Sequence, residues 1–219
     1  MKVCVIGLGY IGLPTAALMA RHGNEVVGVD IDESALERIR KTGGPSEEPG
    51  LAELVKGVLA SGDLRLSTKP ENADAFVLCL PTPVNPDRSA DLSYVNKATI
   101  SIRKYLRKGN LVVLESTVPP GTTDKVVCDL LAKSGLDPRT DLDVAHAPER
   151  VLPGKILEEL VKIDRVMGGV TPRATERVRQ LYSTFVAGKI LLTDATTAEF
   201  VKLIENSFRD VNIAFANEP

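Results

Sequence analysis

The feature that most constrains the fold is the stretch over residues 3–30, VCVIGLGYIGLPTAALMARHGNEVVGVD. An apolar β-branched run leads into Gly7, Gly9 and Gly12, an apolar helix-like segment follows, and a second apolar run ends at Asp30. Glycines at this spacing permit a tight strand-to-helix turn, a close approach of the backbone to a pyrophosphate, and close helix–strand packing. A helix N-terminus attracts phosphate charge. The stretch therefore predicts a βαβ unit that binds a dinucleotide.

The acidic residue at the end of this unit predicts which dinucleotide binds. Asp30 can accept hydrogen bonds from a ribose hydroxyl, whereas it would repel a 2′-phosphate. The next residues, Ile31 and Asp32, supply no cation for such a phosphate. We therefore expect NAD rather than NADP. A signal peptide is the alternative for this apolar stretch, but the glycines, Pro14 and the lack of a small-residue cleavage site argue against it.

The composition is typical of a soluble globular protein, with 43% hydrophobic residues over 219 positions and a net charge of −2. We therefore expect neither nucleic acid nor a membrane as a partner, and a cytoplasmic location. Cys4, Cys79 and Cys128 have no metal-site spacing, so no metal is expected. We interpret them as buried thiols of a reducing compartment, with Cys4 and Cys79 inside strands.

Apolar runs alternate with amphipathic stretches along most of the chain. Strands are expected at 2–6, 25–29, 64–67, 75–80, 111–115, 142–146, 164–168 and 188–192. Helices are expected at 10–22, 33–41, 51–60, 93–106, 122–133, 172–184 and 196–216. This alternation predicts an α/β fold, a Rossmann-like doubly wound and mainly parallel sheet followed by a long helix. We expect the dinucleotide-binding domain to span 1–194 and the helix to occupy 195–219.

Three proline-rich loops follow expected strands, at residues 80–86 (LPTPVNP), 116–123 (STVPPGTT) and 147–154 (APERVLPG). Open α/β sheets bind their ligands beyond the carboxyl ends of the strands. We therefore expect these loops and the glycine loop to form the walls of one cleft. Three ordinary turns are the alternative interpretation.

The last segment predicts a long helix, with Thr196 or Thr197 as the N-cap and Glu199 in the first turn. Three polar residues of this helix share one face at positions i, i+4 and i+7: Lys202, Asn206 and Arg209. A solvated polar stripe is the simplest interpretation of that face. The helix is apolar enough that we expect most of its circumference to be covered instead.

The motifs GLGYIGLP, CLPTPVN, ESTVPPGTT, APERVLPG and AEFVKLIENSFRDVNIAFANE resemble the UDP-glucose/GDP-mannose dehydrogenase family of nucleotide-sugar 6-dehydrogenases. The resemblance covers essentially the whole chain. PERVLPG, DRVMGG at 164–169 and SFRDVNIAFANE are most similar to the branch that acts on UDP-N-acetyl-D-mannosamine. The resemblance implies an NAD-dependent oxidation of the sugar C6 alcohol to the carboxylate, in two hydride transfers, with a cysteine thioester as intermediate.

Several alternatives stay open beside this branch. The substrate could be UDP-N-acetylglucosamine, UDP-glucose or GDP-mannose, because epimers leave little trace in half of a binding site. A hydroxyacid-type dehydrogenase would share the cofactor fold and a Lys and Asn on a later helix, but it would not need PERVLPG. The chain could also be an NAD-binding module without chemistry.

The resemblance implies roles for particular residues. Lys202 would stabilise a developing oxyanion, Asn206 would add a hydrogen-bond donor, Glu149 would act as the base in thioester hydrolysis, and Thr117 would position water. The implied NAD contacts are Gly7, Gly9, Tyr10, Ile11, Gly12, Asp30, Thr82 and Thr117. The implied nucleotide-sugar contacts are Arg150, Val151, Lys202, Asn206 and Arg209, with the arginines suited to a diphosphate.

One departure from the family concerns the nucleophile. In the family, the reactive cysteine lies in a Gly-rich segment that would follow residue 219, and Cys4, Cys79 and Cys128 lie in a different context. We therefore expect a chain without the C-terminal UDP-binding domain, which binds NAD but does not complete the oxidation alone. The resemblance also implies a homodimer formed through the central helix and a product used for a cell-surface glycan.

Overall fold

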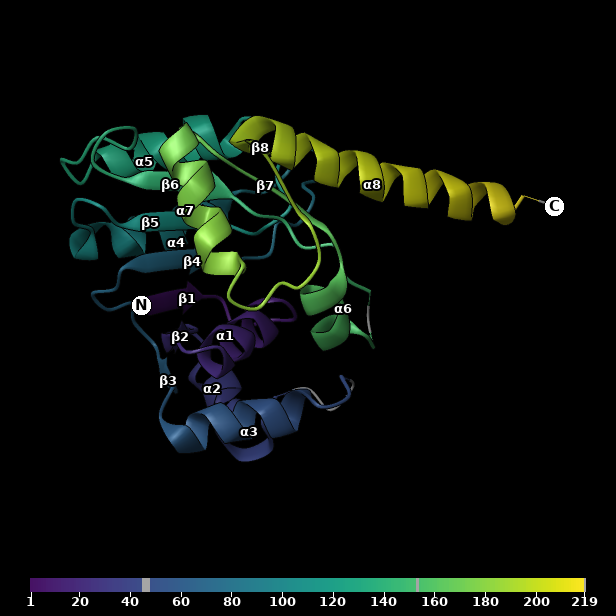
Figure 1. The fold of residues 1–219 in the computed structure, drawn as a ribbon. Coiled ribbons are helices and arrows are strands. Elements are labelled where there is room, and N and C mark those ends of the chain that lie inside the picture. The colour runs from purple at the N-terminus through teal and green to yellow at the C-terminus, as the bar shows by residue number, and fades with distance from the viewer. Residues whose placement is uncertain (45–47, 153, 219) are drawn as a thin grey trace.

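One sheet organises the part of the chain that the computed structural model describes, residues 1–44, 48–152 and 154–218 (Figure 1). Its strand order is β3-β2-β1-β4-β5-β6-β7-β8. The strands are β1 (Lys2–Ile6), β2 (Glu25–Val29), β3 (Leu64–Ser67), β4 (Ala75–Leu78), β5 (Leu111–Leu114), β6 (Asp143–His146), β7 (Arg165–Gly169) and β8 (Ile190–Asp194). Neighbouring strands are parallel except β6 and β7, which are antiparallel. The prediction of an α/β fold with a mainly parallel sheet is therefore confirmed.

Helices cover both faces of this sheet. They are α1 (Gly12–Arg21), α2 (Glu33–Thr42), α3 (Leu51–Ser61), α4 (Ser93–Ile102), α5 (Cys128–Ala132), α6 (Ile156–Lys162), α7 (Pro172–Tyr182) and α8 (Ala195–Ala216). The helix expected at 122–133 is divided into a π-helical segment, η2 (Thr122–Val127), and α5, and the helix expected at 93–106 ends in a 3₁₀ turn, η1 (Arg103–Tyr105). Helix α6 was not expected, because its seven residues are too few to show a helical period.

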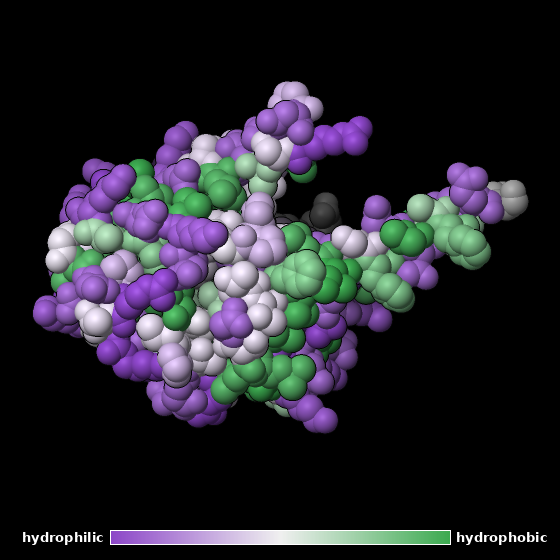
Figure 2. Space-filling view, turned by 90° about the horizontal axis from the view of Figure 1, so that it is seen from above, coloured by the Kyte–Doolittle hydropathy of each residue, from purple (hydrophilic) through white to green (hydrophobic). Residues whose placement is uncertain are grey.

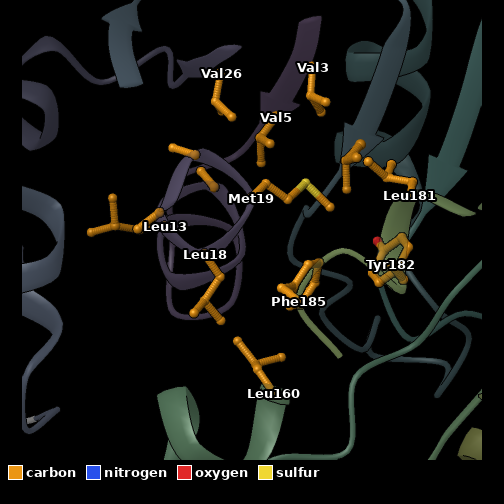
Figure 3. Packing of buried hydrophobic residues seen from close by; sticks show 14 of the residues in the cluster. Val3, Val5, Leu13, Leu18, Met19, Val26, Leu160, Leu181, Tyr182 and Phe185 are labelled. Carbon is orange, nitrogen blue, oxygen red and sulfur yellow. The ribbon is translucent and has the colours of Figure 1, made fainter. Parts of the chain in front are cut away.

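The alternation of side chains along each strand divides the core into two layers. Val3 of β1 belongs to the layer that also contains α1, α3, α6 and α7, and its neighbour Cys4 belongs to the layer with α4, η2 and α5. Figure 3 shows the first layer, in which Leu18 of α1 lies near Leu160 of α6, and Tyr182 of α7 lies beside Phe185. Central strands such as β4 and β5 are apolar and buried on both sides because helices cover both faces, whereas the edge strands β3 and β8 are partly exposed.

Helix α8 begins at the sheet and then leaves the body of the molecule (Figure 1). Its N-cap is Asp194, whose carboxylate accepts hydrogen bonds from the Thr197 backbone N–H at 2.9 Å and from the Thr197 hydroxyl at 2.7 Å. The prediction of Thr196 or Thr197 as the cap was wrong, because a carboxylate accepts both bonds at once. Glu199 consequently lies in the second turn rather than the first.

The second half of α8 is exposed. Phe208 and Phe215 are 71% and 81% exposed, and every described residue from Asn206 onward is exposed. The expectation that most of this helix is covered is therefore wrong for the single chain beyond its first three turns. Among the described residues, no helix has the length and apolar character needed to cross a membrane.

Candidate active site at the carboxyl edge of the sheet

A cavity of about 1250 Å³ lies where the strand order reverses, between the carboxyl ends of β1 and β4. Its walls include the glycine loop, Asp30 at the end of β2, residues 79–82 after β4, residues 115–117 after β5, and Glu149 after β6. Ligands of open α/β sheets bind at this kind of reversal. The prediction that the glycine loop and the three later loops form one cleft is therefore confirmed.

The three glycines of the loop have different reasons for lacking a side chain. Gly7 has a φ of +91°, and a Cβ there would collide with the carbonyl oxygen of Cys79. A Cβ at Gly12 would collide with the carbonyl oxygen of Gly7. A Cβ at Gly9 would meet no protein atom within 4 Å, although Gly9 lines the cavity. Gly7 and Gly12 are thus required by the fold, whereas Gly9 leaves open space that a pyrophosphate can use.

Asp30 is held at the rim of the cavity by the backbone. One of its oxygens accepts a hydrogen bond from the Leu8 N–H and the other from the Asp32 N–H, both at 3.0 Å. A carboxylate has about four acceptor positions, so two stay available for ribose hydroxyls. Because the open space at Gly9 and the carboxylate of Asp30 share one cavity, the residues present fit a dinucleotide.

Other expected cofactor residues lie around the same cavity. Tyr10, Ile11, Thr82 and Thr117 all line it. The Thr82 hydroxyl donates a 2.7 Å hydrogen bond to the Thr117 carbonyl, which joins the loops that follow β4 and β5. The Tyr10 hydroxyl donates to a carboxylate oxygen of Glu48 at 3.2 Å.

A buried ion pair joins the loop after β6 to helix α8. The Lys202 ammonium lies 3.1 Å from Glu149 Oε1, and the two side chains are only 7% and 17% exposed. The other Glu149 oxygen accepts the Val151 N–H at 2.8 Å. A cation at this place can stabilise an oxyanion, and the carboxylate can accept a proton. The fold thus brings a candidate base and a candidate electrostatic catalyst together at the cavity edge.

Of the residues expected to contact the sugar nucleotide, none lines the cavity itself, although Lys202 pairs with Glu149, which does. Arg150 pairs with Glu205 of α8 at 2.6 Å and donates to the Asp164 carbonyl at 3.1 Å. Val151 is half-buried and packs against the core layer that contains α1. Asn206 and Arg209 lie on the exposed part of α8, and neither lines the cavity. Pro153, in the same loop as Arg150, lies outside the described residues.

The cysteines differ from expectation at one position. Cys79 follows β4 rather than lying in it, lines the cavity, and donates an Sγ–H hydrogen bond to Glu115 at 3.0 Å. Burial, and then the Glu115 charge, raise the pKa of the Cys79 thiol well above its usual range. Burial raises the pKa of Cys4 to about 11 and that of Cys128 to about 12. All three thiols are therefore protonated at neutral pH, which makes them poor nucleophiles.

Four buried polar residues near the site were missed from the sequence: Glu48, Glu115, His146 and Arg165. Glu48 accepts hydrogen bonds from the N–H groups of Gly154 and Ile156 at 2.5 and 3.0 Å, and so binds the start of α6. Arg165 and Glu115 form an ion pair at 3.0 Å. Burial lowers the pKa of His146 to about 3. For Glu115, His146 and Arg165, the signal in the sequence is a polar residue at the end of an apolar run, whereas Glu48 lies in the Pro/Gly-rich segment 42–50 and has no such signal.

Comparison with known proteins decides the family. Residues 1–186 match the family described as UDP-glucose/GDP-mannose dehydrogenase family, NAD binding domain. The chain belongs to this family. NAD is thereby its cofactor, as the glycine loop and Asp30 predicted.

Relatives with similar sequences include the UDP-N-acetyl-D-mannosamine dehydrogenase of Methanocaldococcus jannaschii, 53% identical over 99% of this chain and 50% of that protein. The NDP-N-acetyl-D-galactosaminuronic acid dehydrogenase of Ralstonia solanacearum is 48% identical over 99% of this chain and 53% of that protein. The solved UDP-N-acetyl-mannosamine dehydrogenase of Staphylococcus aureus has a TM-score of 0.94 and 49% identity, covering 100% of this chain and 53% of the other. The chain spans about half the length of the curated relatives it matches.

Proposed function

We propose that this chain is the cofactor-binding half of an NAD-dependent nucleotide-sugar 6-dehydrogenase, which oxidises the C6 alcohol of UDP-N-acetyl-D-mannosamine to the carboxylate. The observation that carries the proposal is the Lys202–Glu149 pair, 3.1 Å apart at the edge of the dinucleotide cavity. The similarity to UDP-N-acetyl-D-mannosamine dehydrogenases, 53% for the archaeal relative, supports this choice of substrate.

The proposed chemistry uses the two members of that pair differently. Bound NAD⁺ supplies a hydride acceptor. The Lys202 ammonium has three N–H donors, and Glu149 accepts one of them, so others can be directed at the C6 oxygen as its negative charge grows. Glu149 is held by Lys202 and the Val151 N–H, and it retains lone pairs that can take a proton from water. Thr117 would position that water.

The other residues proposed to contact the sugar nucleotide can do so only if the surroundings of α8 change. Arg150 would bind the diphosphate by sharing its guanidinium with Glu205 or by leaving it. Val151, Asn206 and Arg209 would contact the sugar nucleotide once the exposed part of α8 is covered. No cysteine of this chain is proposed as the nucleophile, since Cys4, Cys79 and Cys128 have raised pKa values. We therefore propose that the chain alone does not complete the oxidation.

The proposed organisation is a cofactor domain over 1–194 and the start of a central helix over 195–219. Apolar side chains on α8 are exposed without cover: Phe200 (53%), Ile204 (49%), Phe208 (71%), Val211 (65%) and Phe215 (81%). Figure 2 shows hydrophobic residues along the arm that projects from the body. Exposed apolar surface of this kind is typical of an interaction site, which supports a homodimer formed through α8. Sedimentation of the chain and of its Phe208→Glu variant tests this.

Titration calorimetry tests the proposed function. We expect the chain to bind NAD⁺ more tightly than NADP⁺ and, with NAD⁺ present, to bind UDP-N-acetylmannosamine more tightly than UDP-glucose or GDP-mannose. UDP-N-acetylgalactosamine belongs in the panel, because the Ralstonia relative points to a galacto-configured sugar. The Lys202→Met variant should lose sugar-nucleotide binding and keep NAD⁺ binding.

Two outcomes would overturn parts of the proposal. NAD⁺ binding without binding of any sugar nucleotide would show that this half of the site does not hold the sugar nucleotide by itself, and would leave NAD⁺ binding as the function of the isolated chain. Failure to bind NAD⁺, in a sample that melts cooperatively by circular dichroism, would contradict the cofactor assignment itself.

A further inference from the structure

A second ion pair lies deeper than the Lys202–Glu149 pair and has no role in the proposed chemistry. Glu115 follows β5 and Arg165 begins β7; their charged groups are 3.0 Å apart and their side chains are 1% and 3% exposed. The Arg165 guanidinium also lies over the ring of Tyr182, 4.8 Å from its centroid. A fully buried pair contributes little net stability, because desolvation offsets the attraction. Net stability therefore does not explain why this ion pair is buried here.

Arg165 holds the backbone that carries Glu149. Its Nη2 donates to the carbonyl oxygens of Ala147 and Pro148, at 3.0 and 3.2 Å, as well as to Glu115. Pro148 directly precedes Glu149, so these bonds determine where the Glu149 main chain lies. The same planar guanidinium also lies over the Tyr182 ring, and a lysine ammonium, a compact group without a planar face, does not reproduce both sets of contacts.

Glu115 joins the same pair to the cofactor side of the cavity. The Glu115 oxygen that does not face Arg165 accepts hydrogen bonds from the Thr15 hydroxyl at 3.3 Å and from Cys79 Sγ at 3.0 Å. Thr15 lies in α1, the helix that begins at the glycine loop, and Cys79 lies against Gly7. The carboxylate thus connects α1, the loop after β4 and, through Arg165, the loop after β6.

We infer that the Glu115–Arg165 pair is a positioning device, which holds Glu149 and its partner Lys202 at a defined place relative to the cofactor helix α1. Glu115 and Arg165 are positioning residues; the inference rests on the proposed function in so far as Glu149 and Lys202 carry the chemistry. Loss of the Arg165 guanidinium lets the 147–149 backbone move and releases Lys202 from Glu149.

Competitive acetylation of the folded chain tests this without relying on activity. Limiting acetic anhydride labels lysines according to their accessibility, and peptide mass spectrometry reports Lys202 relative to Lys41, whose side chain is 77% exposed. In the wild type, the buried and paired Lys202 labels slowly. We expect Arg165→Lys to raise the Lys202-to-Lys41 ratio several-fold.

The matched control is Arg173→Lys at the other edge of the sheet. Arg173 pairs with the buried Asp143 at 2.6 Å and donates to the Leu142 carbonyl at 2.9 Å, so it also combines a carboxylate with backbone acceptors. This variant should lose a comparable set of bonds and leave the Lys202 ratio unchanged. An equal rise in both variants would show general loosening and overturn the inference.

A second variant keeps the test decisive if Arg165→Lys does not fold. The double substitution of Arg165→Met with Glu115→Gln removes both charges together, a change that buried pairs commonly tolerate. We expect this chain to fold, by circular dichroism, and to show the raised Lys202 ratio because the guanidinium is absent. A folded double variant with Lys202 as protected as in the wild type would refute the positioning role. Failure of the folded wild type to bind NAD⁺ would instead refute the proposed function, without changing the ratio.

Discussion

Buried charged residues lie at both ends of strands β5 and β6, but their ion-pair partners differ in exposure. At the amino end, Asp143 is 1% exposed, and it pairs with Arg173 and Arg177 of α7, whose side chains are 53% and 31% exposed. At the carboxyl end, both members of the Glu115–Arg165 pair are buried. The carboxyl-end pair lies at the cavity, since Glu115 lines it, and Asp143 does not.

The two ends therefore differ in how many charged groups are removed from water. At the amino end, each cation stays partly in water, so the pairs attach α7 to the sheet with only the Asp143 carboxylate fully desolvated. At the carboxyl end, four charged groups and the uncharged His146 lie close to one cavity, although such groups are costly to bury. Concentrations of buried titratable groups beside a cavity are typical of functional sites.

The largest expected effect comes from breaking the carboxyl-end pair. Arg165→Met leaves the Glu115 carboxylate buried without its cation, which should lower the free energy of unfolding by about 3–5 kcal/mol. Arg177→Met removes the longer contact to Asp143, 3.4 Å, and leaves Arg173 in place. We expect that variant to lose at most about 1 kcal/mol. Urea unfolding measures both, and equal losses would contradict the distinction between the two ends.

The next effect is on cofactor binding at the carboxyl edge. Asp30→Ala removes the acceptor for the ribose and should weaken NAD⁺ binding by about 1.5–3 kcal/mol, or roughly ten- to a hundredfold. Asp32→Ala is the control, because Asp32 caps α2 by accepting the Ser34 N–H and does not line the cavity. Calorimetry should show unchanged NAD⁺ affinity for this variant. A similar loss in both would mean that Asp30 acts only through the local backbone.

A third expected effect is the pH dependence that buried His146 imposes. Burial lowers its pKa from 6.5 to about 3, so below pH 6.5 the unfolded chain binds a proton that the folded chain does not. The contribution of His146 to the free energy of unfolding has its full value above pH 6.5. It falls on acidification, by at most about 1.4 kcal/mol per pH unit, until the pH nears 3. Between pH 7 and pH 5 the loss should approach about 2 kcal/mol.

Urea unfolding at those two pH values, with two variants, isolates the His146 contribution. His146→Leu should reduce the pH dependence, whereas the exposed His22→Gln should leave it as in the wild type. If the His146 variant keeps the full dependence, the acid sensitivity belongs to other groups.

The smallest effect on stability is expected at the middle glycine. Gly9→Ala adds a Cβ that meets no protein atom within 4 Å, so the free energy of unfolding should change by about 1 kcal/mol or less. Its NAD⁺ affinity should nevertheless fall, because the added methyl group occupies space in the cavity. Gly12→Ala, whose Cβ would collide with the Gly7 carbonyl, should lose much more stability. Unimpaired NAD⁺ binding by Gly9→Ala would place the pyrophosphate elsewhere.

Most of the fold was predictable because it depends on local pattern. Strand periodicity, the glycine spacing and the position of Asp30 are properties of short segments, and parallel strands necessarily bring their following loops to one edge. The pairing of Thr82 with the Thr117 backbone follows from that rule. Two local features were not predicted correctly. Helix α6 is too short to show a helical period, and the N-cap of α8 is Asp194 rather than one of the two threonines that follow it.

The glycine loop and Asp30 predict NAD binding from the sequence, since each part of that prediction lies within about one βαβ unit. Which charges meet at the carboxyl edge depends instead on the tertiary structure. Strand β7 runs antiparallel to β6, so its first residue, Arg165, lies beyond the carboxyl end of β6 rather than at the opposite edge. Helix α8 then carries Lys202 to Glu149, 53 residues earlier. No local pattern encodes strand direction or a contact across that distance, because both depend on how the whole core packs.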